Sequence, residues 1–172
     1  QLYRGVTEML RSLISMMTAI GLASPGCDSG GGHDQEPAVE AGMLEAQAFS
    51  ALRDGDVMWV REGIQTGKWI MPSIRAVGVA EEAELTAELI LDDGRAVGGI
   101  KLTVRFLEAA DGALLLDYFP IPIAPDGTDV GLEEIYGSAA TLELHLVDAS
   151  GTHAESSTAV RLENGDSVLS GE

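Results

Sequence analysis

The feature that most constrains the fold is an alternation of apolar and polar residues on both sides of Asp93-Gly94. An Asp-Gly dipeptide suits the two-residue turn of a β-hairpin, in which both central residues need positive φ. Pairing outward from this turn sets apolar residues opposite one another: Leu91 with Ala96, Leu89 with Gly98, Ala87 with Ile100 and Leu85 with Leu102. The other face then carries Glu84, Thr86, Glu88, Lys101, Thr103 and Arg105. The sequence therefore predicts an amphipathic antiparallel hairpin.

Two further hairpins are predicted by the same alternation. Leucines in residues 142–146 share a face with Ser156, Thr158 and Val160 only if the loop has about five residues, 149–153. A third hairpin is expected around Asp111-Gly112, where it joins the strand ending at Phe106 to the strand that contains Tyr118.

An earlier pair of strands is predicted over residues 57–60 and 68–79, on either side of Thr66-Gly67. Pro72 marks the second of them as an edge strand or a bulged one. The chain thus has about seven short strands and no convincing interior helix, and its 21 glycines favour turns. We expect an all-β fold, an antiparallel two-sheet sandwich of the immunoglobulin-like or fibronectin-like kind. The cysteine pair of antibody domains is missing, because the chain has one cysteine.

That single cysteine, Cys27, follows an apolar run over residues 13–23. A basic residue, Arg11, precedes the run, and small residues separate it from Cys27. This order of segments is typical of a secretory signal peptide. The apolar run itself is too short to span a bilayer as a helix. We therefore expect a signal peptide over residues 1–26, with residues 1–8 upstream of a natural start at Met9. The alternative is a buried helix with an incidental free thiol, which would require an amphipathic pattern that the run lacks.

The segment resembles the signal of bacterial lipoproteins, in which the cysteine is lipidated and becomes the first mature residue. Gly26 fits that pattern, whereas Ser24 and Pro25 depart from it. Residues 27–48 begin with a Gly-rich polar stretch and are predicted to tether a folded domain to the membrane. The 172 residues leave room for one domain, expected over residues 49–164, with a flexible end at 165–172.

Three short motifs carry a second resemblance: residues 49–56 (FSALRDGD), residues 63–69 (GIQTGKW) and Asp92-Asp93-Gly94. They look like those of a group of myxobacterial-type bacterial lipoproteins with an immunoglobulin-like sandwich. The likeness covers roughly residues 49–162. It implies a fold and a location, and it transfers no activity.

The formal charge of −18 argues against nucleic-acid binding, because such a surface repels phosphates. The few arginines are isolated, so none forms a patch for anionic lipid head groups. Membrane contact is therefore expected through the lipidated Cys27. A protein of the envelope or a glycan would be the other partner.

Trp59 and Trp69 are ten residues apart on predicted neighbouring strands. Exposed on one face, they could stack on a sugar ring; buried, they would fill the core. Tyr136 belongs to the long loop 120–137, a candidate for ligand binding because loops on rigid sandwiches often bind. The same loop could instead cover an edge strand.

Acidic residues in this loop, Asp126, Asp129 and Glu133, are calcium candidates because calcium prefers oxygen ligands. In a chain with 28 acidic residues such a cluster arises easily, so an ordinary solvated loop is the simpler explanation, and no other cofactor is expected. His145 and His153 are not expected to converge on a metal. We find no Gly-x-Ser-x-Gly nucleophile motif and no carboxylate pair in an apolar setting.

The sequence thus predicts a non-catalytic lipoprotein, exported and anchored in the bacterial cell envelope at the outer membrane or a periplasm-facing membrane surface. Its domain would serve protein interaction or a structural role. The alternative is a ligand-binding module for carbohydrate or calcium.

Overall fold

The computed structural model describes residues 35–46, 48–62, 67–123 and 131–165. These residues form an all-β structure of two sheets with one short helix, α1 (Leu132–Ile135). Seven strands close into a barrel, in the order β10 (Ile121–Ile123), β4 (Lys68–Ile70), β3 (Asp56–Glu62), β12 (His153–Asn164), β11 (Ala139–Asp148), β6 (Glu82–Leu91) and β7 (Ala96–Arg105). Five more form a separate sheet, in the order β2 (Ala48–Ala51), β1 (Ala38–Glu45), β5 (Ser73–Val77), β9 (Leu114–Leu116) and β8 (Leu107–Glu108).

The predicted hairpin around Asp93-Gly94 is confirmed as β6–β7, with Leu85, Ala87 and Leu89 opposite their expected partners. A bulge after Leu89 shifts the register near the turn, so that Ala96 lies opposite Ile90 rather than Leu91. An extra residue on one strand is what a β-bulge inserts. The apolar face of β6 is buried along its whole length.

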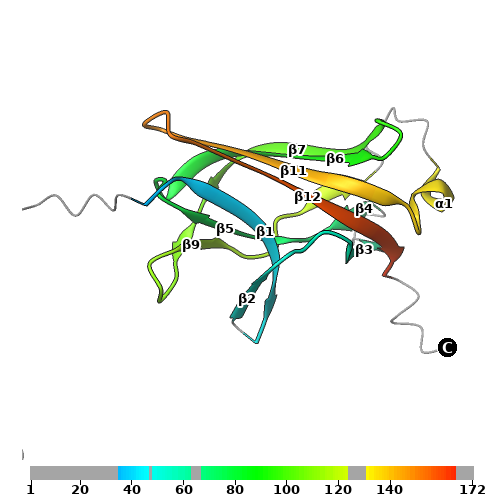
Figure 1. The fold of residues 1–172 in the computed structure, drawn as a ribbon, viewed down its shortest axis with the longest axis horizontal. Coiled ribbons are helices and arrows are strands. Elements are labelled where there is room, and N and C mark those ends of the chain that lie inside the picture. Colours follow the sequence, from blue (N-terminus) through cyan, green and yellow to red (C-terminus); the bar gives the residue numbers. More distant parts are fainter. Residues whose placement is uncertain (1–34, 47, 63–66, 124–130, 166–172) are drawn as a thin grey trace, which may run out of the picture. The chain divides into compact units, whose positions relative to one another are not determined.

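The second hairpin is confirmed as β11–β12, whose long strands run side by side in Figure 1. Leu142 lies opposite Thr158 and Leu144 opposite Ser156. The loop spans residues 149–152, one residue shorter than predicted, because His153 already pairs with Val147.

One pair of neighbouring strands within the barrel is parallel. β12 runs parallel to β3, and Val160 lies opposite Asp56. The barrel closes between β10 and β7 through a single residue pair, Ile123 with Gly98. A Cβ on Gly98 would lie 2.7 Å from the Pro122 carbonyl oxygen, so this close approach requires glycine.

The two-sheet sandwich expected from the sequence is therefore wrong, although the all-β class is correct. The chain crosses from one sheet to the other at points where the alternation of apolar and polar residues predicts an uninterrupted strand. The single strand expected over residues 68–79 breaks at Met71-Pro72, and its halves, β4 and β5, lie in different sheets. Proline lacks the N–H that a continuous ladder would need.

A second crossing occurs at Phe106, which is buried between β7 and β8. The third hairpin does turn at Asp111-Gly112, but β9 pairs with β8 and not with the strand 102–106. The fold also begins earlier than the predicted domain start at residue 49, because β1 pairs with β5 and buries Val39 and Ala41.

Candidate functional site

The site with the most distinctive surface chemistry is a cleft of about 200 Å³. We call it the methionine–aromatic cleft. Its lining combines sulfur-containing, aromatic and aliphatic side chains with one arginine and one serine: Met43, Leu44, Met58, Trp59, Arg61, Met71, Ser73 and Tyr118. These residues come from both sheets and from the segments that connect them.

Strand β3 supplies one wall by simple alternation. Met58 and Val60 are buried, whereas Trp59 and Arg61 are exposed, as the alternation of side chains along a strand predicts. Trp59 remains 37% exposed. The sequence left open whether this tryptophan fills the core or a surface; the structure places it on the outer face.

The crossing from β4 to β5 supplies a second wall. Met71 is 37% exposed, while Ser73, two residues on, is buried. The Ser73 hydroxyl donates a hydrogen bond to the Asp117 carboxylate at 3.0 Å, so its polar atom is satisfied. Met71 is therefore the exposed apolar side chain of this wall.

Tyr118 completes the rim with a φ of 53°, in the left-handed region. The next residue, Phe119, is buried, and its N–H donates to the Pro72 carbonyl at 2.7 Å. The turn that buries Phe119 leaves Tyr118 65% exposed.

Large exposed apolar side chains therefore concentrate at this cleft. Of the five found among the described residues, Trp59, Met71 and Tyr118 line it, and Leu102 and Leu107 lie elsewhere. Tryptophan, tyrosine, methionine and arginine are enriched at protein interfaces. A volume of about 200 Å³ is below the usual range of about 300–1,000 Å³ for small-molecule pockets. The cleft suits one inserted apolar side chain.

The other sequence candidates are not brought into this cleft. Trp69 is half-buried on β4 opposite Arg61, so it shares the outer face with Trp59. Tyr136 follows α1 and packs partly against the core.

Of the calcium candidates, Asp126 and Asp129 lie outside the described residues, and Glu133 is an exposed residue of α1. Within the described ranges, no group of three or more histidine, cysteine or acidic side chains could hold a metal ion. His145 points outward toward Glu155, with 3.3 Å between Nδ1 and Oε1. His153 begins β12 and is exposed.

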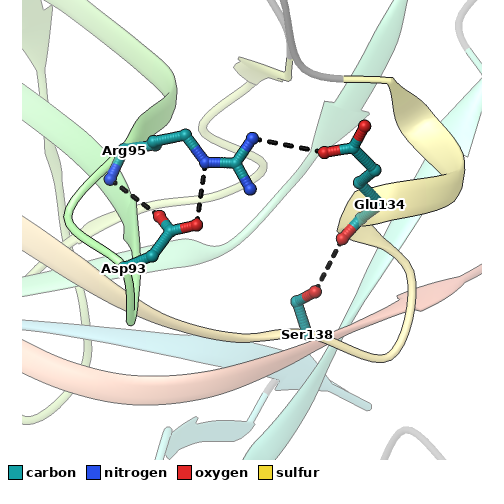
Figure 2. A network of polar contacts seen from close by, with 4 residues as sticks. All are labelled: Asp93, Arg95, Glu134 and Ser138. Atoms are coloured by element: carbon teal, nitrogen blue, oxygen red, sulfur yellow. Dashed lines mark hydrogen bonds and ion pairs between the residues drawn. The ribbon is translucent and has the colours of Figure 1, made fainter.

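The neighbouring Glu134 has a structural partner, shown in Figure 2. Arg95 contacts Asp93 at 2.8 Å and Glu134 at 3.2 Å, and the Ser138 hydroxyl donates to the Glu134 carbonyl at 2.7 Å. The Arg95 backbone N–H, followed by its side chain, lowers the pKa of Asp93. This network ties the β6–β7 turn to α1, and both carboxylates are engaged in it.

A larger cavity of about 500 Å³ lies over the five-stranded sheet. The cation in its lining, Arg75, contacts Glu40 at 3.4 Å and Asp111 at 3.2 Å. The Ala113 N–H first and Arg75 second lower the pKa of Asp111, so this carboxylate stays ionised beside the arginine. With two carboxylates against one guanidinium, the cavity has no net positive charge to select an anion.

Sequence reasoning missed Met71 and Tyr118. Pro72 was the one sequence signal near Met71, because a proline interrupts a strand and indicates that the residues beside it leave the sheet. For Tyr118 the alternation pattern indicated an ordinary strand position, and no neighbouring residue indicates that its backbone adopts the left-handed conformation.

The chain matches no protein-family model, no curated protein and no solved structure. Cys27 and the predicted signal lie outside the described residues. Within the part of the chain that is described, no helix has the length and apolar character needed to cross a membrane.

Proposed function

We propose that this protein is a non-catalytic lipoprotein of the bacterial cell envelope whose barrel domain binds a partner protein at the methionine–aromatic cleft. The observation that carries the proposal is the meeting of Trp59, Met71 and Tyr118 around one cavity. Exposed apolar groups gathered in this way are typical of interaction sites on soluble domains.

The chemistry of the lining indicates what the partner presents. Methionine side chains adapt their shape to an inserted group, and an aromatic rim excludes water around it. We therefore expect a large apolar anchor residue. The charge of −18 favours a basic surface around that anchor, because complementary charge speeds encounter.

The envelope location is supported by the apolar run before Cys27 and the Gly-rich stretch after it. A domain held close to a membrane by a short tether meets partners at high effective concentration. A modest cleft is sufficient under those conditions.

A carbohydrate-binding module is the second candidate, since Trp59 and Trp69 share an outer face of β3 and β4. A sugar platform needs flat exposed rings beside hydrogen-bonding groups. Trp69 is half-buried, and apolar side chains dominate the lining of the cleft beside Trp59. This arrangement favours an apolar protein anchor over a sugar.

Selection from a displayed library of random peptides tests the proposal. Enriched peptides should carry a large apolar residue flanked by lysine or arginine, and calorimetry should show that Trp59→Ala or Tyr118→Ala weakens their binding. Loss of a buried interface anchor costs about 2 kcal/mol, or about thirtyfold in affinity.

Leu107→Ala is the matched control, because Leu107 is 73% exposed and lies outside the cleft. Peptides that bind the cleft variants as tightly as the parent protein would reject the proposal. Saturable binding of a soluble oligosaccharide, abolished by Trp69→Ala and unaffected by Tyr118→Ala, would establish the carbohydrate alternative instead.

A further inference from the structure

The barrel closes on only part of β7. Its single pairing with β10 sets Ile123 against Gly98. Because the two strands are antiparallel, the next pair along β7 would be Gly99 with Pro122. Pro122 has no N–H to donate, so the ladder cannot continue past it. Among the described strands, none pairs with residues 100–105 on this side, which we call the free edge of β7.

The backbone groups at the free edge can be assigned from the ladder on the other side. Phe106 N–H donates to the Glu81 carbonyl at 2.8 Å, toward β6. Because hydrogen-bonding direction alternates along an antiparallel strand, Ile100, Leu102 and Val104 also point toward β6. The N–H and C=O groups of Lys101, Thr103 and Arg105 consequently point out of the sheet edge.

Side-chain exposure agrees with the lack of a neighbouring strand among the described residues at this position. Leu102 lies opposite Leu85 on the core-facing side of the hairpin. Leu85 is fully buried, yet Leu102 is 44% exposed. An added strand would cover Leu102 as the neighbouring strands cover Leu85.

The charges on the outer face specify what such a strand should carry. β6 presents acidic side chains and β7 basic ones, with Lys101 Nζ 2.7 Å from Glu84 Oε1. Arg105 contacts Glu81 at 3.5 Å. An acidic strand beyond β7 would continue the alternation of sign, and opposite charges across neighbouring strands stabilise a sheet. A second copy of β7 would place basic side chains against basic ones.

We propose that the free edge of β7 binds an extended segment of a partner protein as an additional strand, with acidic side chains outward and apolar side chains over Leu102. Addition of a peptide strand to an exposed edge is an established mode of recognition, in which main-chain hydrogen bonds supply affinity and side-chain pattern supplies specificity. The free edge shares no residue with the methionine–aromatic cleft, so the two proposals stand separately.

Amide hydrogen exchange of the full chain, followed by NMR, tests this directly. In the free protein, Lys101 and Thr103 should exchange much faster than Ile100 and Leu102, because only the latter pair donates to β6. An end-blocked peptide Thr-Val-Glu-Val-Glu-Val-Thr should slow exchange at Lys101 and Thr103 by about tenfold or more when it saturates the edge. Replacement of both peptide glutamates by lysine should weaken binding.

Thr103→Pro removes an edge donor without removing a bond to β6, and proline is tolerated at such edge positions. This variant should retain the cooperative melting of the parent and lose peptide binding, whereas Thr103→Val, which keeps the N–H, should bind. Unchanged exchange at Lys101 with the peptide present, or equal binding by Thr103→Pro, would overturn the proposal. So would protection of the free edge by self-association without peptide.

Discussion

At the scale of single residues, Asp148 organises more of the backbone than any sequence pattern suggested. It is buried at the end of β11. Its carboxylate accepts hydrogen bonds from the Ser150 hydroxyl at 2.6 Å, the Ser150 N–H at 2.8 Å and the Thr152 N–H at 3.0 Å, which together shape the β11–β12 turn. Its other oxygen accepts from the Ala80 N–H at 2.9 Å. One side chain thus joins two connections that are 68 residues apart.

Replacement of Asp148 by alanine should lower the free energy of unfolding by about 2–3 kcal/mol, because four donors, three of them backbone N–H groups, lose a charged acceptor. Urea denaturation at pH 7 measures the loss. Asp92→Ala is the control, since it removes the same charge from an exposed position in the β6–β7 turn. Equal losses for the two variants would contradict the assigned role.

The same carboxylate predicts a pH dependence. Hydrogen bonds led by the Ser150 hydroxyl lower the pKa of Asp148 from 3.8 to about 2. A carboxylate whose pKa is lower in the folded state stabilises the fold above its unfolded pKa and loses that contribution as pH falls toward the folded value. The gap in unfolding free energy between the parent and Asp148→Asn should therefore narrow by about 2 kcal/mol from pH 5 to pH 2. A constant gap would refute this.

At the scale of elements, two of the three predicted hairpins were correct, and the way the strands assemble into sheets was not predictable. The β6–β7 and β11–β12 hairpins depend on local turns and a period of two, which the sequence displays directly. The pairing of β3 with β12 joins residues more than 100 positions apart, and no local pattern encodes it. The breaks at Pro72 and Phe106 likewise separate strands that alternation alone would place in one sheet.

Gly98 forms the residue pair that closes the barrel, so the fold should be sensitive to substitution at this position. Gly98→Ala places a Cβ against the Pro122 carbonyl, and the backbone of β10 or β7 must move. We expect a loss of about 1–3 kcal/mol in the free energy of unfolding, the usual cost of overpacking. Amide exchange in β10 should also accelerate.

Gly131→Ala is the matched control, since an added Cβ there meets only the Glu134 carboxylate, at 3.8 Å. A Gly98→Ala protein that is as stable as this control would show that the β7–β10 contact contributes little to the fold.

At the scale of the whole molecule, the candidate site, like the fold, could be predicted from the sequence only in part. Trp59 was recognisable as an aromatic candidate from its place beside Trp69. Its companions Met71 and Tyr118 come from chain crossings that only the assembled sheets define. The predicted tether, residues 27–48, also includes strand β1. This strand was missed because its small residues Ala38, Ala41 and Gly42 give too weak an apolar pattern to be recognised from sequence.

We propose that Cys27 holds a binding domain at a membrane. Mass spectrometry of the mature N-terminus, after expression in a bacterium that exports lipoproteins, tests it most directly. We expect a chain that begins at Cys27 and carries covalent lipid, and a Cys27→Ser protein that carries none and leaves the membrane fraction. An unlipidated chain that retains the residues before Cys27 would contradict it.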